Sequence, residues 1–597
     1  MHKQVGLGHA LQPGAEVQQR LDMRRLRRPQ HFLLVDDVVE AQLQPLMRAV
    51  IGEGGGGGKF RVENGEDMAD AGIAVLAQLR EAANGDLEGQ GHAVNLGARG
   101  RKFKFGPWPS LARGRKSRAT GSVNMLVFFV IAIIFLALVY LHDIRQTHHT
   151  ILRNFPVIGH VRYFAETWGE YMRQYQYLPD WAERPFNRME RSWVYRSAKG
   201  VSNLISFGSE AVPSFIFRNA TFPILEEEQK SYPGKMIGIT EGPGACREPF
   251  MARSFFNISG MSYGALSHAA VTALSRGARL GEVYMSTGEG GLSSYHLDGG
   301  ADIVMQIGTA KYGVRDVAGE LSEERLRVVA AYPQVKMFEI KLAQGAKPGK
   351  GGILPGNKVT EEVAKIRGIP VGQPSISPNR HKDIGNLQEL GVFIARVREI
   401  TGKPVGVKFV LGDPGFLDEW FHDCAENPAH CPDFIQIDGG EGGTGAAPEP
   451  LADYVGLPIT QALPYVSAMR YEHGLAGRIR IIASGKLVTP DKVAWALCMG
   501  ADLVSSARGF MFSLGCIQAM KCGSGRCPTG VTAVEPRLIA GLDPADKAVR
   551  VARYAQKMRE EVEIIAHSCG LSNASLFAPK HVTEIERGVA GFRAMSG

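Results

Sequence analysis

Eight short apolar runs after about residue 236 alternate with segments of helical character, and each run ends in a turn rich in glycine and polar residues. Strands that alternate with helices pair in parallel, which leaves a doubly wound sheet or a (β/α)8 barrel. The polar turns lie where a barrel carries its active-site loops, so we predict an α/β fold, a (β/α)8 TIM barrel over residues 236–545. The runs are Phe255–Ile258, Val283–Met285, Ile303–Ile307, Met337–Ile340, Val405–Val410, Phe434–Ile437, Ile479–Ala483 and Leu503–Ser505.

Three cysteines lie close together near the end of the predicted barrel: Cys516, Cys522 and Cys527, the last followed by Pro528. A compact run of thiolates that ends in Cys-Pro is typical of iron–sulfur ligation. We therefore predict an iron–sulfur centre here, with a zinc ion or unconnected thiols as the alternatives. The eight cysteines of the chain form no regular framework, which favours a reducing compartment over a set of disulfides.

The turns after the apolar runs place lysine, glutamate and glutamine side chains among close backbone approaches, which together indicate a ligand pocket. The last two turns, Ser484–Lys486 and Ser506–Arg508, follow the final predicted strands. Barrels commonly bind a phosphate group at this position. No GxGxxG motif follows a strand with an acidic residue about twenty positions later, so we expect no nicotinamide-binding domain in the chain.

Met125–Leu141 is a run of seventeen apolar residues without a charge, at the short end of what spans a bilayer. We predict a transmembrane helix over residues 123–142, with a buried core helix and a cleaved signal peptide as alternatives. The basic residues 101–118 would place the C-terminal part outside the cytoplasm, whereas a chain that starts at Met125 gives the opposite orientation. An enzyme fed by cellular reductant suits the second arrangement. We expect a single-pass protein of the inner (cytoplasmic) membrane with its catalytic domain in the cytoplasm.

The remaining segments have weaker patterns. Residues 1–120 show no sustained hydrophobic period, and we expect a disordered extension, with a small domain or a misassigned start as alternatives. Residues 143–235 are rich in Arg, Trp and Tyr and are expected to form a helical cap or linker, and residues 546–597 are expected to form terminal helices. The net charge of +8 depends on the basic run 101–118. It is therefore poor evidence for nucleic-acid binding, and we expect no nucleic-acid partner.

Taken in order, these motifs resemble the FMN-binding domain of the glutamate synthase large subunit. The resemblance covers roughly residues 236–540 and is most specific at Lys341–Lys358, Gly442–Ala447 and the cysteine run. It implies a (β/α)8 barrel that binds FMN and a [3Fe–4S] cluster held by the three cysteines. The implied reaction is the reductive amination of 2-oxoglutarate with ammonia to L-glutamate, with hydride from reduced FMN and electrons through the cluster.

The resemblance also implies roles for individual residues. Lys408 would stabilise the reduced flavin ring, while Lys341 and Lys311 would bind the substrate carboxylates. Lys311 stands where the family usually has arginine, and lysine keeps the charge but loses the bidentate fork. Glu289 would hold ammonia or the imine, and Gln344 belongs to the same catalytic group. The implied cofactor-binding residues are Met261, Ser262, Thr287, Gln306 and Lys408 at the flavin ring, and Gly485, Lys486, Ala507 and Arg508 at its phosphate.

Two expectations separate this chain from complete glutamate synthases. No cysteine precedes Cys246, so we expect no glutaminase domain with an N-terminal cysteine nucleophile, and nitrogen would come from free ammonia or a separate glutaminase. Electrons would come from a separate reductase or a ferredoxin. Two alternatives stay open: a synthase or dehydrogenase that uses another amine, for example one making N-methylglutamate from methylamine, and a non-catalytic, membrane-tethered electron-transfer protein.

Overall fold

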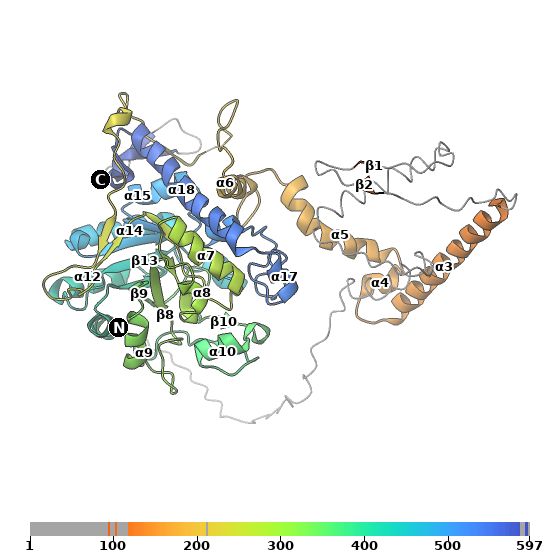
Figure 1. Ribbon diagram of the computed structural model, residues 1–597, viewed down its shortest axis with the longest axis horizontal. Helices are drawn as coiled ribbons and strands as arrows, with labels where there is room; N and C mark the ends of the chain where they lie inside the picture. The colour runs from red at the N-terminus through yellow and green to blue at the C-terminus, as the bar shows by residue number, and fades with distance from the viewer. Residues whose placement is uncertain (1–93, 96–101, 104–116, 211–212, 586–591, 595–597) are drawn as a thin grey trace, which may run out of the picture. The chain divides into compact units, whose positions relative to one another are not determined.

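Of the 597-residue chain, the computed structural model (Figure 1) describes residues 94–95, 102–103, 117–210, 213–585 and 592–594. The chain separates into two compact units, residues 1–138 and residues 139–597. The extension predicted over residues 1–120 lies outside the described residues, apart from β1 (Val94–Asn95), β2 (Lys102–Phe103) and the start of α3 (Ser117–Arg145).

Eight parallel strands close into a barrel in the second unit (Figure 1). Each strand pairs with the next one of the barrel in chain order, and the last returns to the first where Val504 lies beside Phe256. The predicted (β/α)8 fold is confirmed, because each predicted run coincides with one strand to within a residue or two. The strands are β6 (Phe256–Ile258), β7 (Met285–Ser286), β8 (Ile303–Ile307), β9 (Val335–Lys341), β12 (Val405–Phe409), β13 (Phe434–Asp438), β14 (Arg480–Ser484) and β15 (Leu503–Ser506).

These strands are apolar because both of their faces are covered. Every residue of β8, β12 and β13 is buried, as expected where helices cover the outside and side chains fill the inside. Packing requires glycine at position 406 of β12, because a Cβ there would lie 2.3 Å from the ring of Phe434. The polar residues Gln306, Lys408 and Gln436 within these strands are therefore buried and need partners.

Helices connect the strands along the outside of the barrel. Ser267 and Asn386 cap two of them, each side chain accepting a hydrogen bond from a first-turn N–H group. Gly402 ends α11 in the left-handed conformation, with φ of 73°. The α-helices are α7 (His268–Leu280), α8 (Ser294–Leu297), α9 (Glu323–Ala330), α10 (Glu361–Arg367), α11 (Leu387–Thr401), α12 (Gly415–Glu426), α13 (Glu449–Tyr454), α14 (Ile459–Glu472), α15 (Pro490–Cys498) and α16 (Arg508–Ser513), and the single turns are η3 (Gly288–Gly290), η4 (Gly356–Lys358) and η5 (Leu475–Gly477).

The segment before the barrel is helical over its first part. The helices end at Lys199, and the described residues between there and the barrel contain only short strands and a single helical turn, so the predicted cap over residues 143–235 is helical in part. Two short antiparallel pairs lie outside the barrel sheet. The pair of β4 with β5 precedes the barrel strands in the sequence, and the pair of β10 with β11 lies between β9 and β12. The elements are α4 (Thr150–Asn154), α5 (Gly159–Met172), η1 (Arg173–Tyr177), α6 (Arg188–Lys199), β3 (Phe215–Phe217), η2 (Glu226–Glu228), β4 (Lys235–Ile237), β5 (Phe250–Ala252), β10 (Ile353–Leu354) and β11 (Ser375–Ile376).

The C-terminal segment differs from the prediction of terminal helices over residues 546–597. A long helix is present, but β16 then pairs antiparallel with both β3 and β17. The partner strand β3 lies more than 350 residues earlier in the chain. The local sequence of β16 therefore gives no pattern that distinguishes a strand from a loop. The elements are α17 (Pro536–Ala540), α18 (Pro544–Ser568), η6 (Ala574–Leu576), η7 (Pro579–His581), β16 (Val582–Ile585) and β17 (Phe592–Ala594).

The long helix α18 packs along α7 and α6 and joins the cap to the barrel. A Cβ on Gly277 of α7 would lie 2.5 Å from the Val551 side chain, so glycine is needed for the two helices to approach. The ring of Tyr554 contacts the rings of Phe256 and Phe510, with centroids 5.6 and 5.0 Å away. Its hydroxyl donates to the carbonyl oxygen of Val488 at 3.0 Å, which satisfies a fully buried polar group.

Residues 127–145 of α3 form a helix that is long and apolar enough to cross a membrane, and it is the one such helix among the described residues. Its side chains between Val127 and Leu141 are exposed almost throughout. The helix coincides with the segment predicted to span the bilayer, 123–142. Length and composition therefore agree with the transmembrane helix, which stays a prediction.

A buried ion-pair cluster stabilises the end of the barrel opposite the strands' carboxyl ends. Asp433, the residue before β13, is fully buried. One carboxylate oxygen accepts from Arg398 Nε at 3.0 Å and Val405 N at 2.8 Å, and the other accepts from Arg478 Nη1 at 2.6 Å. Loss of one member of such a cluster leaves buried charges unpaired, which is far more costly than loss of a surface pair.

We expect Asp433→Ala to lower the free energy of unfolding by about 3–5 kcal/mol, because Arg398 and Arg478 lose their carboxylate partner. The measurement is chemical unfolding followed by circular dichroism. Asp418→Ala removes an exposed carboxylate beside His473 and serves as the control, with an expected change within about 0.5 kcal/mol. Equal destabilisation by the two substitutions would contradict this assignment.

Candidate active site

The carboxyl ends of the barrel strands bring three of the predicted catalytic residues into contact. Lys341 is the last residue of β9, and Glu289 lies in η3, shortly after β7. The Lys341 ammonium donates to Glu289 Oε2 at 3.0 Å and to Gln344 Oε1 at 2.5 Å. A cation, a carboxylate and an amide thus meet at the barrel mouth, where TIM-barrel enzymes carry their catalytic groups.

Glu289 is held as a carboxylate by its neighbours. Burial alone would raise the pKa of Glu289, but Lys341 at 3.0 Å, together with Lys347, holds it below its ordinary value. The surrounding loops pack closely on the side chain. A Cβ on Gly352 would lie 2.1 Å from Glu289 Oε1, and one on Gly308 would lie 2.7 Å from Glu289 Cβ. Both the charge and the position of this carboxylate are therefore set by the fold.

A second polar network lies among the barrel strands themselves. Glu339 of β9 is almost fully buried, and Gln306 of β8 donates to one of its carboxylate oxygens. With its amide turned to suit both neighbours, Gln436 of β13 donates to the other oxygen at 2.9 Å and accepts from the Lys408 ammonium at 3.1 Å. Lys408 also lies 3.6 Å from Asp438 Oδ2. Burial raises the pKa of Glu339, and the charge of Lys408 opposes that rise.

Sequence reasoning identified Gln306 and Lys408 in this network but missed Glu339, Gln436 and Asp438. The sequence signal that could have identified these residues was a polar side chain inside an otherwise apolar strand. Glu339 and Lys341 are two residues apart in β9, so both side chains lie on the same face of that strand, and the same holds for Gln436 and Asp438 in β13. In a sequence such residues look like interruptions of a strand until the barrel places them side by side.

Four of the five residues predicted at the flavin ring, all except Lys408, lie together at the first strands of the barrel. Gly288, with φ of 63°, approaches the preceding loop so closely that a Cβ on it would lie 2.6 Å from Ser262 N. Thr287 Oγ1 accepts a hydrogen bond from Gln306 N at 3.1 Å. Met261, next to Ser262, is buried like Thr287 and Gln306. Glycine at position 288 therefore allows these loops to form one surface.

The predicted phosphate-binding turn after β14 packs against the loop after β13. Gly485 has φ of 141°, and a Cβ on it would lie 3.2 Å from backbone atoms of Gly439. Lys486 has φ of 50°, and its ammonium lies 5.8 Å from the centroid of the Phe186 ring, which belongs to the cap. Ala507 precedes α16 and is partly buried. The structure thus brings the cap to this edge of the site.

Arg508, which was predicted to contact the phosphate, donates hydrogen bonds to the protein itself, including one to the cysteine run. Its guanidinium donates to the carbonyl oxygen of Thr444 at 2.7 Å and to the Cys522 sulfur at 3.8 Å. A Cβ on Gly443 would lie 2.8 Å from Arg508 Nε, so glycine leaves the room that this side chain occupies. Arg508 therefore connects the glycine-rich loop after β13 with one of the three clustered thiols.

The three predicted iron ligands lie in one loop after α16. Burial raises the pKa of Cys516 to about 11, and Cys522 and Cys527 contribute to the rise, so the thiols are near neighbours. Burial also opposes ionisation of Cys527, but hydrogen bonds with Thr529 and Thr532 hold its pKa below the ordinary value. Among the described residues no three His, Cys, Asp or Glu side chains converge on a single metal ion. Sulfurs that bind different irons of one cluster need not converge on one point.

The cap grips this cysteine loop through a residue that sequence reasoning missed, Gln518. It is buried and has left-handed backbone, with φ of 57°. Its amide donates to Glu183 Oε1 at 2.8 Å and to the carbonyl oxygen of Phe186 at 3.0 Å, and its oxygen accepts from Phe186 N at 3.2 Å. Gln174 of η1 donates to the Gln518 carbonyl oxygen at 3.2 Å, and Tyr195 of α6 donates to that of Cys516 at 2.6 Å.

Lys311, also predicted to be catalytic, forms its ion pairs with two other acids of the protein. Its side chain is 2% exposed, and its ammonium pairs with Asp383 Oδ1 at 2.8 Å and Glu320 Oε2 at 3.1 Å. Its backbone is left-handed, with φ of 51°. The structure therefore places this charge among acids of the protein, and the assignment of Lys311 to a substrate carboxylate stays a prediction.

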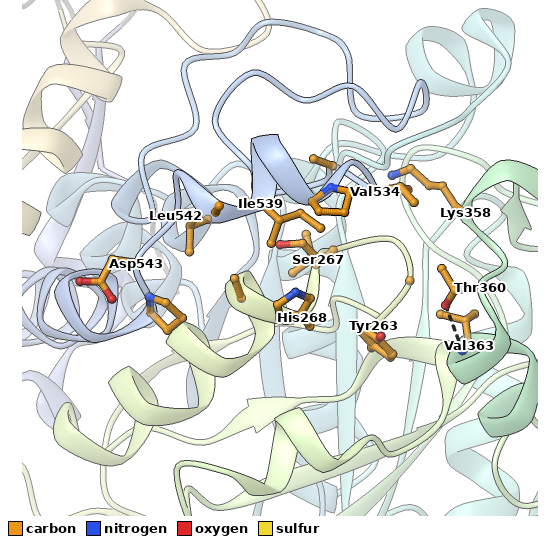
Figure 2. A pocket seen from close by; sticks show the side chains of 17 residues that line it. Tyr263, Ser267, His268, Lys358, Thr360, Val363, Val534, Ile539, Leu542 and Asp543 are labelled. Atoms are coloured by element: carbon orange, nitrogen blue, oxygen red, sulfur yellow. Dashed lines mark hydrogen bonds between the residues drawn. The ribbon is translucent and has the colours of Figure 1, made fainter. Parts of the chain in front are cut away.

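A cavity of about 600 Å³ lies between the start of α7 and residues 533–544. Figure 2 shows the side chains that line it. It is lined by the turn before α7, by residues around α10 and by residues 533–544. The ammonium of Lys358, at its edge, donates to the carbonyl oxygens of Cys522 and Thr532 at 2.9 and 2.8 Å. Lys341, Glu289 and the other predicted catalytic residues do not line this cavity, so it is distinct from the barrel mouth.

Comparison with known proteins places the barrel in a family. The family model described as the conserved region in glutamate synthase matches residues 221–572. The glutamate synthase large subunit-like protein YerD of Bacillus subtilis is 42% identical over 499 residues, which cover 76% of this chain and 95% of that protein. The archaeal-type glutamate synthase (NADPH) of Thermotoga maritima is 35% identical over 318 residues, and the match covers 52% of this chain but 58% of that enzyme.

Solved structures with a similar fold are more distant. A flavocytochrome b2 variant with benzoylformate has a TM-score of 0.38 at 12% identity, over 66% of this chain and 78% of that chain. A variant of an active chimera of (S)-mandelate dehydrogenase has a TM-score of 0.40 at 11% identity, over 70% of this chain and 99% of that chain. Likeness at this level adds nothing to the barrel that the strand order establishes.

The match over residues 221–572 includes all eight barrel strands, the cysteine run and α18, whereas the cap elements that contact the cysteine loop lie before it. The matched region exceeds half of the chain, and the relative from Bacillus subtilis is covered over nearly its whole length. The chain belongs to the glutamate synthase family, a family of oxidoreductases that act on CH–NH2 donors.

Proposed function

We propose that the chain catalyses the reductive amination of 2-oxoglutarate to L-glutamate, with FMN as its hydride-carrying cofactor and an iron–sulfur cluster as the entry point for electrons. The observation that carries the proposal is the contact of Lys341 with Glu289 and Gln344 at the barrel mouth. The names of relatives, which include archaeal-type glutamate synthases, support the class of reaction.

The residues at the mouth fit a flavin. Gly260 leaves a cradle, because a Cβ there would lie 3.1 Å from Gln306 Nε2, and Thr287 and Gln306 offer buried polar groups next to it. Bound FMN would supply the hydride for the substrate carbon. Lys408, oriented by Gln436 at 3.1 Å, would offer its positive charge to the negative charge of the reduced ring. The turns at Gly485 and Ala507 would hold the phosphate.

The substrate would meet Lys341 and Glu289 directly. The Lys341 ammonium, which the protein itself pairs with Glu289, is suited to a substrate carboxylate. Glu289, held ionised, would accept a hydrogen bond from the ammonium or imine nitrogen and hold the proton there. Gln344, in contact with Lys341, would orient the same carboxylate. The loops that enclose Glu289 would limit the access of water.

The three clustered cysteines fit a [3Fe–4S] cluster by ligand type and number. Cys516, Cys522 and Cys527 would supply one thiolate each, and the cluster would pass single electrons to the flavin. Arg508, which donates to the Cys522 sulfur at 3.8 Å, would stabilise thiolate charge at that ligand. The same guanidinium borders the predicted phosphate-binding turn and would connect the two cofactor sites.

Nitrogen and electrons would reach the site from other molecules. Ammonia would come free in solution or from a separate glutaminase, and electrons from a separate reductase or a ferredoxin. The apolar helix α3 would anchor the chain in the inner (cytoplasmic) membrane as a single span, with the barrel in the cytoplasm.

The direct test is turnover by the purified full chain. A protein with FMN and the cluster is expected to show flavin absorption bands with a broad iron–sulfur shoulder. After anaerobic reduction, the flavin should be reoxidised by 2-oxoglutarate and ammonia together, with formation of glutamate. Reoxidation with methylamine but not with ammonia would indicate the N-methylglutamate reaction instead. A chain that contains both cofactors and reacts with no pair of amine and 2-oxo acid would be an electron-transfer protein.

We expect Glu289→Gln to lower kcat by roughly 10²–10⁴-fold, because a neutral amide cannot hold the proton of the incoming amine. FMN content and the visible spectrum should be unchanged, which separates a catalytic effect from a structural one. Glu323→Gln, on the exposed surface of α9, is the matched control. Retention of full activity by Glu289→Gln would exclude this role.

We expect Gln518→Ala to weaken binding of the cluster by about 10-fold or more, because the loop that carries Cys516 loses its hydrogen bonds to the cap. The measurement is iron and sulfide content per FMN after gel filtration. Gln176→Ala, an exposed glutamine of η1, provides the control and should keep its iron. Loss of FMN and iron together would point to general unfolding instead.

A further inference from the structure

The helix α5 exposes one continuous apolar and aromatic face. Val161, Phe164, Trp168 and Tyr171 follow one another at spacings of three and four residues, which places them along one face of the helix. Their side chains are between 46% and 64% exposed, and Gly159 is the one buried residue of this fourteen-residue helix. Such a stripe is costly to leave in water, and within the part of the chain that the structure describes nothing packs over it.

The start of this helix is fixed to the end of the apolar helix α3. Asp143, in the last turn of α3, is fully buried and accepts from Val157 N at 2.8 Å, and it lies 3.0 Å from His160 Nε2. Leu152 of α4 packs against Gly159, where a Cβ would lie 3.0 Å from its side chain. The stripe therefore begins beside the end of the segment that is apolar enough to span a bilayer.

We propose that α5 lies in the headgroup layer of the lipid bilayer, with Val161, Phe164, Trp168 and Tyr171 facing the acyl chains. This inference rests on the proposed membrane anchoring by α3. Aromatic side chains are enriched at the membrane–water interface, and amphipathic helices bind there through one apolar face. The ion pair of Arg162 with Glu166, at 3.0 Å, lies on the helix outside the stripe.

The composition of the stripe favours lipid over a second copy of the chain. Spacings of three and four residues also occur in coiled coils, but the facing positions there are mainly Leu, Ile and Val. Here three of the four positions are aromatic, and Tyr175 of η1 continues the stripe as a further exposed aromatic residue. The rings of Phe164 and Trp168 already lie against each other, with centroids 5.7 Å apart.

The charges of this segment predict how it binds. Arg162 and Arg173 are balanced by Glu166 and Glu170 along α5 and η1. Attraction to anionic headgroups therefore contributes little, and burial of the stripe provides the binding free energy. Neutral phosphatidylcholine should suffice, and added salt should leave the association unchanged.

The inference also places the cysteine run relative to the membrane. The segment η1 continues directly from α5, and Gln174 within it donates to the carbonyl oxygen of Gln518 at 3.2 Å. The loop that carries Cys516 is thus held by the element that follows the lipid-bound helix. An electron donor that uses the cysteine run would approach it beside the lipid surface.

The test uses the full chain in phosphatidylcholine nanodiscs and measures quenching of tryptophan fluorescence by brominated lipids. The chain has six tryptophans, so the contribution of Trp168 is obtained from Trp168→Phe. We expect bromine near the headgroup end of the acyl chain to quench more strongly than bromine near its terminus, and we expect Trp168→Phe to lose this difference. Trp420→Phe, which removes a tryptophan buried in the barrel, is the control and should keep it.

Three outcomes would overturn the inference, and they are distinguishable. A chain that stays in solution and does not enter nanodiscs would refute the anchoring by α3, and this inference with it. Incorporation into nanodiscs with equal quenching in wild type and Trp168→Phe would refute the placement of α5 alone. Protection of Trp168 from acrylamide without quenching by bromine, together with a dimeric mass, would show that a second copy covers the stripe.

Discussion

The ion pair between Lys341 and Glu289 is the contact on which the barrel mouth depends. Two charges taken out of water are tolerated only when they neutralise each other and their remaining hydrogen-bonding groups are satisfied. Here they come from the ends of β9 and β7, and Gln344 completes the set. Lys341 holds the pKa of Glu289 below its ordinary value, which favours the carboxylate form of Glu289 when no substrate is bound. A substrate carboxylate that bound to Lys341 would compete with Glu289 for the same ammonium group.

The same principle extends inward to Lys408, Asp438, Gln436 and Glu339, which connect three strands through buried polar contacts. It also extends outward to the cysteine loop. There Gln518 satisfies its amide with groups from the cap, so a segment more than 300 residues earlier in the chain fixes the position of the clustered thiols. The cap therefore helps to hold the loop of clustered thiols in addition to being a linker.

The relationship to YerD supports this view of the cap. The 499 aligned residues exceed the length of the matched region 221–572, and few residues follow residue 572. Most of the additional similarity must therefore lie before residue 221, in the segment that contains the cap. The archaeal-type relative aligns over 318 residues, which is close to the length of the barrel region. Of these two relatives, YerD therefore matches more of the chain than the barrel region.

The local pattern of the sequence was enough to predict the barrel and its loops. Eight apolar runs followed by glycine-rich turns specify parallel strands whose both faces are buried, and the spacing of Cys516, Cys522 and Cys527 depends on nothing outside the loop. Lys341, Glu289 and Gln344 could also be predicted, because each lies at or shortly after the end of a strand. The partners of these residues were not. Glu339 and Gln436 become neighbours through barrel closure, and Arg508 contacts Cys522 through the packing of two loops. The strand β16 pairs with β3, although most of the barrel separates them in the sequence. Such contacts follow from how distant segments pack in three dimensions, and a one-dimensional pattern contains no record of them.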